Sequence, residues 1–192
     1  MKGKGRSVKL VIIGIILVAL VVGYYFYLSN KVKTAREEQT EVTAVQNVLM
    51  RDLERSYPPT PKEVLRYYCE ITKCFYNEEY TEEELQQLAL KAQELYDDEL
   101  VANKTQEQYL KDLKSEIAER KENKCTISGY ELSPSTDVKE YTKDGYTCAT
   151  MYCTLKLKQD GKTTQSMEQF VLRKDEEGHW KIYGWQLVNA SK

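Results

Sequence analysis

The chain has 192 residues and a formal charge of −2, with 28 basic side chains, 30 acidic side chains and one histidine. Its first 30 residues contain four basic groups and no acid, so the remainder holds 24 basic and 30 acidic groups. Nucleic-acid-binding proteins usually present a basic face to phosphates, so this acidic remainder argues against a nucleic-acid partner. Its length suits a single domain.

The N-terminal part contains one long apolar run. It covers residues 10–28 without a charged side chain, and basic residues flank it on both sides. Its 19 residues, at about 1.5 Å each in a helix, reach roughly 28 Å, close to the thickness of a bilayer's hydrocarbon core. Aromatic rings favour the membrane interface, and Tyr24, Tyr25 and Tyr27 lie at the far end of the run. The run predicts a single transmembrane anchor.

The flanking charges predict the orientation of this anchor. Four basic groups precede it without an acid, which favours a cytoplasmic N-terminus. A cleaved signal peptide would have a shorter apolar region and a small-residue cleavage site, and neither is present. We therefore expect a cytoplasmic tail over residues 1–9, the anchor over 10–28, a stalk over 29–40 and an extracytoplasmic domain over 41–192, at the cell membrane.

Four helices are expected in the first half of this domain. The first follows a stripe from Val42 to Leu53 and ends before Pro58. The second begins at Thr60 with proline at its first position. The third and fourth begin at the capping-box motifs Thr81–Glu84 and Thr105–Gln108. The apolar stripes of the last three are narrow, so each should pack through one side.

After residue 123 the pattern changes to strands. Strands are expected over 125–132, 146–157, 163–173 and 180–188, and Gly184 marks a bulge in the last. Asp160-Gly161 predicts a tight hairpin turn. Residues 146–157 alternate clearly, which indicates an antiparallel strand with one buried face. The order of elements predicts an α+β domain, with about four helices packed on an antiparallel sheet of about four strands.

The closing segment Gly178–Leu187 reads Gly-His-Trp-Lys-Ile-Tyr-Gly-Trp-Gln-Leu. It resembles the final strand of NTF2-like (SnoaL-like, cystatin-like) domains, in which a turn with glycine often precedes Trp-Lys-Ile. The resemblance implies a curved sheet wrapped on helices to form a cone. Many members carry an early hairpin between helices, which this sequence lacks. Small single-span proteins with such a domain are common in bacteria, so the resemblance also implies a bacterial source.

Three kinds of function are consistent with this architecture. The leading one is a non-enzymatic module that binds a ligand or an envelope protein partner, with homodimerisation through the open sheet face. A scaffold subunit of a secretion or conjugation apparatus shares the same layout. The third is a cone-pocket enzyme of the isomerase or dehydratase type, for which Glu168 or Asp137 is the candidate acid. No catalytic motif matches, so no enzymatic activity, cofactor or metal is expected.

Candidate pocket-lining residues are Tyr68, Phe75, Met151 and Trp180. Tyrosine is frequent, with 15 in the chain, and several lie on the expected helices (Tyr67, Tyr68, Tyr76, Tyr80, Tyr96 and Tyr109). They could line a pocket, or they could fill the edges of a core or an interface.

The cysteines, the histidine and the acidic clusters are interpreted as structural or solvated groups rather than as catalytic or metal-binding ones. The five cysteines are expected to act as small buried hydrophobes, with Cys125–Cys148 as the most plausible disulfide. His179 is expected to be an exposed turn residue. Three acidic clusters (Glu82–Glu84, Asp97–Glu99 and Asp175–Glu177) lack the order of a calcium loop and are expected to be solvated.

Overall fold

The computed structural model describes Val22, Tyr24 and residues 42–188, and the chain divides into two compact units, Met1–Val42 and Thr43–Lys192. The expected tail, anchor and stalk over residues 1–40 therefore lie outside the described residues, apart from Val22 and Tyr24, which are helical. No helix within the described residues is both long and apolar enough to cross a membrane.

Helices come first in the described part of the second unit. They are α2 (Ala44–Leu49), α3 (Pro61–Asn77), α4 (Glu82–Glu94), α5 (Asp98–Ala102) and α6 (Gln106–Glu122). A threonine hydroxyl before α2, α3, α4 and α6 accepts a hydrogen bond from the third helical amide, which satisfies one of the free donors at each helix start. The predicted starts at Thr60, Thr81 and Thr105 are confirmed.

The first helix is shorter than its apolar stripe predicts. It ends at Leu49, because the chain then turns around Asp52, whose carboxylate accepts hydrogen bonds from the amides of Glu54 and Arg55. Such a local side-chain bond competes with the helical hydrogen bond. Leu53 is still buried, but it reaches the core from this turn rather than from the helix.

Helix α3 is the centre of the helical layer. It packs against β1, β3 and β5 of the sheet and against α2, α4 and α6. The narrow stripe expected for it is therefore wrong, because neighbours on several sides bury a wider set of its residues (Val64, Leu65, Tyr67, Cys69, Ile71, Cys74 and Phe75).

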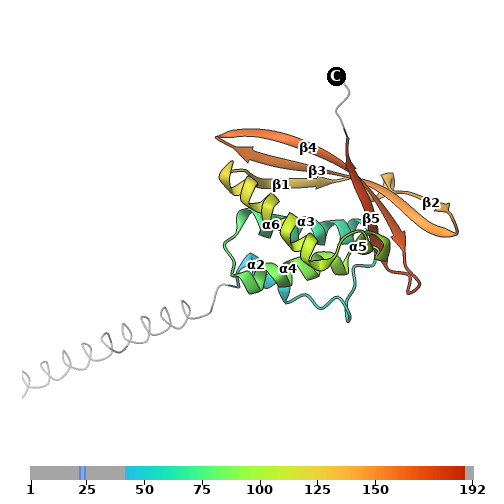
Figure 1. Ribbon diagram of the computed structural model, residues 1–192, viewed down its shortest axis with the longest axis horizontal. Helices are drawn as coiled ribbons and strands as arrows, with labels where there is room; N and C mark the ends of the chain where they lie inside the picture. The colour runs from blue at the N-terminus through green and yellow to red at the C-terminus, as the bar shows by residue number, and fades with distance from the viewer. Residues whose placement is uncertain (1–21, 23, 25–41, 189–192) are drawn as a thin grey trace, which may run out of the picture. The chain divides into compact units, whose positions relative to one another are not determined.

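The described strands form one antiparallel sheet, and all the helices lie on one face of it (Figure 1). The strands are β1 (Thr126–Leu132), β2 (Lys139–Lys143), β3 (Tyr146–Gln159), β4 (Lys162–Lys174) and β5 (Trp180–Leu187). Their order is β1-β3-β4-β5, and β2 pairs with the other half of the same β3 edge as β1. The predicted meander over the last three strands is confirmed, and the sheet has one strand more than expected.

The additional strand is β2. All five of its residues are exposed, so it has no buried face and no alternation of apolar and polar side chains. The sequence feature that indicates β2 is the Asp144-Gly145 turn that follows it. Asp144 and Gly145 both have positive φ, 51° and 85°, as do Asp160 and Gly161 in the predicted β3–β4 hairpin. Asp-Gly is the pair that favours such a two-residue turn.

Strand β5 carries the predicted bulge. Leu172 pairs with Ile182 and Val171 with Gly184, so Tyr183 is an extra residue with no partner in β4. In a regular strand Trp180 and Trp185 would lie on opposite faces, because side chains alternate. The extra residue brings both onto the face that carries Phe170 and the helices.

The link between α4 and α5 extends the sheet beside β5. Tyr96 forms a parallel bridge to Ile182, and the Asp97 amide donates to the Ile182 carbonyl at 2.9 Å. Because neighbouring residues in extended backbone point to opposite sides, Tyr96 faces the helices while Asp97 faces Arg173.

Asp97 and Arg173 form a buried ion pair. The Arg173 Nε–Asp97 Oδ2 distance is 2.8 Å and the Nη2–Oδ1 distance is 2.5 Å, and Asp97 is only 4% exposed. The solvated state expected for this acidic cluster is therefore wrong for Asp97. Its carboxylate holds the α4–α5 link to the end of β4 and caps α5 as well.

Candidate functional site

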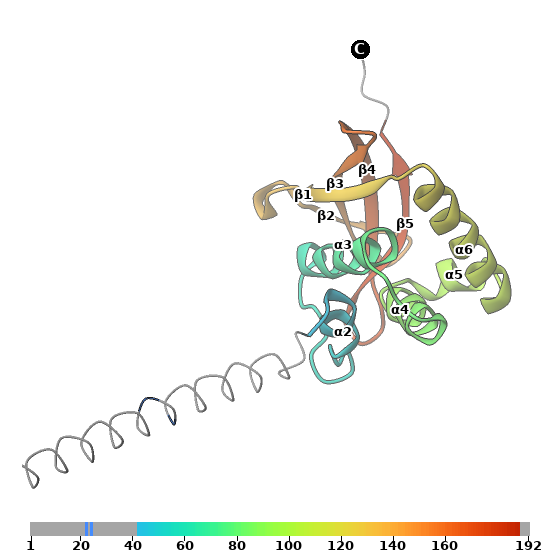
Figure 2. The ribbon, with the colours of Figure 1, turned by 90° about the vertical axis from the view of Figure 1, so that its left-hand side faces the viewer.

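A cavity of about 380 Å³ lies between the inner face of the sheet and helices α3–α6. This volume is within the range of small-molecule sites, at roughly 300–1,000 Å³. Figure 2 shows α3 beneath the sheet and α6 standing to one side of it. The cavity is lined from α3, the α4–α5 link, α6, β3, β4 and β5, so its wall depends on the whole domain rather than on one loop.

Aromatic side chains form much of the wall. Four of them pack around a common centre: Tyr68, Tyr96, Phe170 and Trp185. The Tyr68 ring lies 6.1 Å from Tyr96, 5.6 Å from Phe170 and 5.9 Å from Trp185, measured between ring centroids. Trp185 in turn lies 5.9 Å from Tyr96 and 5.8 Å from Phe170. These separations are those of interacting aromatic pairs.

Three hydroxyl groups of this region are buried together. Burial raises the pKa of the Tyr68, Tyr96 and Tyr109 hydroxyls, so all three stay protonated and can donate. The Tyr109 hydroxyl has no partner of hydrogen-bond geometry among the described residues, although Tyr96 is close enough to contribute to its raised pKa. A buried hydroxyl in this state is a candidate donor or acceptor for a bound molecule.

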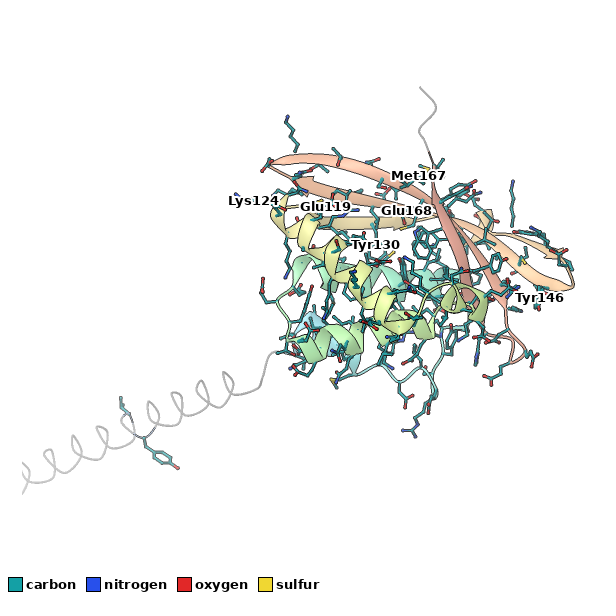
Figure 3. The ribbon with its side chains drawn as sticks, viewed as in Figure 1. Glu119, Lys124, Tyr130, Tyr146, Met167 and Glu168 are labelled. Carbon is teal, nitrogen blue, oxygen red and sulfur yellow. The ribbon has the colours of Figure 1, made fainter. Side chains whose placement is uncertain are left out.

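Glu168 is the central polar group of the cavity. It lies on the inner face of β4, in the middle of the sheet (Figure 3), and pairs with Cys153 of β3 and Leu187 of β5. Its carboxylate has no hydrogen bond and no ion pair among the described residues. Burial raises the pKa of this carboxyl, Arg120 lowers it, and Glu116 raises it.

The other charged groups of the wall already have partners. Glu116 accepts a hydrogen bond from the Tyr76 hydroxyl at 2.6 Å and lies 3.8 Å from Arg120. Arg120 also lies over the Tyr76 ring, at 5.3 Å from its centroid. Lys104 and Asp112 form an exposed pair at 2.6 Å, which places this pair at the solvent side of the cavity. Among the described residues, Glu168 is therefore the charged group of the wall that has no hydrogen bond or ion pair of its own, and only the more distant charge of Arg120 favours its ionised form.

The family described as Domain of unknown function (DUF6715) matches residues 1–185. The chain belongs to this family. No curated protein matches the chain. The DUF6715 description assigns no activity.

The DUF6715 cavity includes some of the residues that the sequence singled out. Tyr68, Phe75 and Glu168 line it. The lining does not include Met151, which packs in the core, or Trp180, which is buried beside Lys174 and Tyr57. Asp137 is exposed in the short 3₁₀ helix Ser135–Asp137, away from the cavity.

Sequence reasoning missed Glu116 and Arg120 as wall residues, and it named Trp180 rather than Trp185 among the residues that line the pocket. Trp185 could have been found, because the bulge at Gly184 was predicted and an extra residue reverses the side on which the next residues lie. Glu116 and Arg120 are one helical turn apart on α6, whose pattern of charges is that of an ordinary solvated face.

All five cysteines are buried free thiols, which confirms the expectation of small buried hydrophobes. Cys125 and Cys148 are free thiols, and the pairing of Thr126 with Lys158 places Cys125 near the opposite end of β3 from Cys148. About ten residues of strand, at roughly 3.3 Å each, separate two thiols that would have to approach closely, so the predicted disulfide is wrong. The two neighbouring thiols are instead Cys69 and Cys153, with their sulfur atoms 3.5 Å apart in the cavity wall.

His179 and the outer face of the sheet lie apart from the cavity. The half-exposed His179 ring stacks on Tyr57 with centroids 4.4 Å apart. The outer face exposes Tyr152 and Met167 among polar residues, and Gln169 donates to the Tyr152 hydroxyl at 2.9 Å. Homodimerisation through this face stays a prediction.

Proposed function

We propose that this chain is a membrane-tethered binding protein whose domain holds a small molecule in the cavity beneath the sheet. The observation that carries the proposal is Glu168, an unpartnered carboxylate inside an aromatic wall. A partly buried carboxylate without a hydrogen bond or ion pair costs stability, so its position in a cavity is better explained by a ligand that completes it. Pockets of this kind combine apolar walls with a few polar groups that orient the ligand.

We also propose that the domain is NTF2-like. In support, helices precede a twisted antiparallel sheet and cover one face of it, and a cavity lies between the two layers. The early hairpin found in many members is absent from the described residues, where α3 to α6 follow one another without a strand.

The test is to block the cavity and to compare what purifies with the protein. Ser166 lies in the cavity wall, whereas the adjacent Gln165 is exposed on the opposite side of β4. Ser166→Phe should fill the cavity, and Gln165→Phe is the matched control. Native mass spectrometry of the full-length chain should detect a small molecule on the natural protein and on the control.

The same molecule should be missing from Ser166→Phe. A molecule retained equally by both variants would place binding elsewhere. Absence of any bound molecule from all three proteins, together with no stabilisation by extracted cell metabolites, would count against a ligand-binding function.

A cone-pocket enzyme is the second candidate, and Glu168 is also the observation that favours it. A carboxyl with a raised pKa beside protonated tyrosine hydroxyls has the groups needed for proton transfer to and from a bound substrate. Under this alternative the molecule released from the natural protein changes mass or structure on incubation, and Glu168→Gln abolishes the change.

A further inference from the structure

We propose that the occupant of the cavity is an organic cation, an ammonium group with apolar substituents, whose charge Glu168 balances. This inference rests on the proposed binding function and specifies the ligand class.

The balance of charge in the wall leaves one negative group. The charged side chains there are three carboxylates (Asp112, Glu116 and Glu168) and two cations (Lys104 and Arg120). Lys104 is paired with Asp112 and Arg120 lies beside Glu116. The negative charge that remains is that of Glu168, and a monovalent cation would neutralise it.

The aromatic rings around this charge suit an ammonium group. Phe170 is two residues along β4 from Glu168 on the same face, and Trp185 pairs with Phe170. Tyr68 lies against both rings, and its hydroxyl is within the electrostatic reach of Glu168. The face of an aromatic ring attracts a cation, and several rings around one site are the usual way of recognising alkylated ammonium ions.

Other ligand classes fit this wall less well. An anion would need a free basic group, but both basic groups of the wall are already engaged, and it would approach Glu116 and Glu168. A hard metal ion would need several oxygen ligands, and the described residues contain no group of acidic, histidine or cysteine side chains arranged to hold one. A neutral molecule would leave Glu168 uncompensated.

The test compares three probes of nearly equal shape on the full-length chain in phosphatidylglycerol nanodiscs. Choline is the cation, dimethylbutanol is its uncharged carbon isostere, and dimethylbutyrate is an anion of similar size. Affinities are measured by ligand-observed NMR titration, with empty nanodiscs as the baseline. Choline should bind about tenfold more tightly than dimethylbutanol, and dimethylbutyrate should bind least.

Two cavity variants and one matched control locate the effect. Glu168→Gln keeps the shape of the side chain and removes its charge, so choline should lose about tenfold in affinity while dimethylbutanol changes little. Glu140→Gln on exposed β2 is the matched control and should leave all three affinities unchanged. Trp185→Leu should weaken choline more than dimethylbutanol, because it removes an aromatic face.

The outcomes separate this inference from the function on which it rests. If dimethylbutanol or dimethylbutyrate binds as tightly as choline, or if Glu168→Gln leaves choline binding unchanged, the cation is wrong while binding in the cavity stands. If none of the probes saturates the folded protein, the small ammonium ligand is overturned, and the binding function is then decided separately by the co-purification comparison with Ser166→Phe.

Discussion

Glu168 is a residue whose ionisation opposes folding. Burial raises the pKa of its carboxyl in the folded protein above the unfolded value. The folded protein therefore binds more protons than the unfolded chain at pH values between these two pKa values, and stability falls as the pH rises through that window. Below this window Glu168 is protonated in both the folded and the unfolded state, so it costs no stability. Above the window the folded state bears the full free-energy cost of ionising the carboxyl.

Glu168→Gln is expected to stabilise the ligand-free protein at neutral pH. The amide cannot ionise, so the variant should have the higher melting temperature at neutral pH, and the difference should shrink as the pH is lowered toward the unfolded-state pKa of glutamate. Differential scanning calorimetry across this range measures the effect. A variant that is less stable than the natural protein at neutral pH would show that the carboxylate makes a favourable contact in the fold.

Arg173 is a residue whose charge supports the fold. It lies between the Tyr146 and Tyr183 rings, 4.1 Å and 4.7 Å from their centroids, and its side chain is 13% exposed. The hydrogen bonds to Asp97 raise the pKa of its guanidinium, which stays charged throughout. Removing it would leave the Asp97 carboxylate buried without a positively charged partner, with only the Glu99 amide still donating to it.

Arg173→Met is therefore expected to lower the free energy of unfolding by about 3 kcal/mol. Lys156→Met, which removes one partner of the exposed pair with Glu131, is the matched control and should cost less than about 1 kcal/mol. Urea unfolding of both variants measures these values. Adding Asp97→Asn to Arg173→Met should recover part of the loss, and no recovery would mean that packing on the two tyrosines dominates.

At the scale of elements, α6 is the most weakly attached of the longer helices. Of its 17 residues only Leu113 and Ile117 are buried, whereas α3, which has the same length, buries residues on several sides. Local opening needs little free energy where few apolar contacts break. Because α6 also carries Glu116 and Arg120 in the cavity wall, its opening would admit a ligand.

Amide hydrogen exchange is expected to show this difference. The amides of α6 should exchange much faster than those of α3, and filling the cavity with Ser166→Phe should slow α6 without changing α3. Mass-spectrometric exchange on the full-length chain resolves the two helices. Equal protection of α3 and α6 would show that α6 opens only with the whole domain.

The elements that could be predicted from the sequence are those with local signals. Helix starts are set by threonine caps within four residues, strand β3 is marked by alternation with one buried face, and β4 follows the Asp160-Gly161 turn. Strand β2 has no buried face, so its sequence shows no alternation of apolar and polar residues from which it could be predicted. The wide burial of α3 depends on neighbours distant in sequence, which a stripe on one helix does not reveal.

The site was predictable only in part for the same reason. Glu168, Tyr68 and Phe75 were found because their types or their helical spacing suggest a pocket. Met151 and Trp180 have the same apolar character, but the depth at which each lies is set by packing of the whole domain. That Glu168 has no hydrogen bond or ion pair among the described residues depends on the folded surroundings, and the proposed ligand follows from it.

At the scale of the whole molecule, the proposed function depends on which side of the membrane the domain faces. A cavity outside the cytoplasm would sample molecules of the envelope or the surroundings, whereas one inside would sample metabolites. The five cysteines of the chain provide a way to decide, because all of them lie in the described domain and all are buried thiols. The folded natural protein should therefore react little with a maleimide.

A single introduced cysteine then reports the side on which it lies. Ser135→Cys places a thiol on the exposed 3₁₀ helix, and Ser7→Cys places one in the basic tail. With a membrane-impermeant maleimide on intact cells, Ser135→Cys should be labelled at once and Ser7→Cys only after the membrane is permeabilised, since the basic residues before the apolar run favour the cytoplasm. The reverse pattern would place the cavity in the cytoplasm, and labelling of Ser135→Cys in a soluble fraction free of membranes would contradict the anchor over residues 10–28.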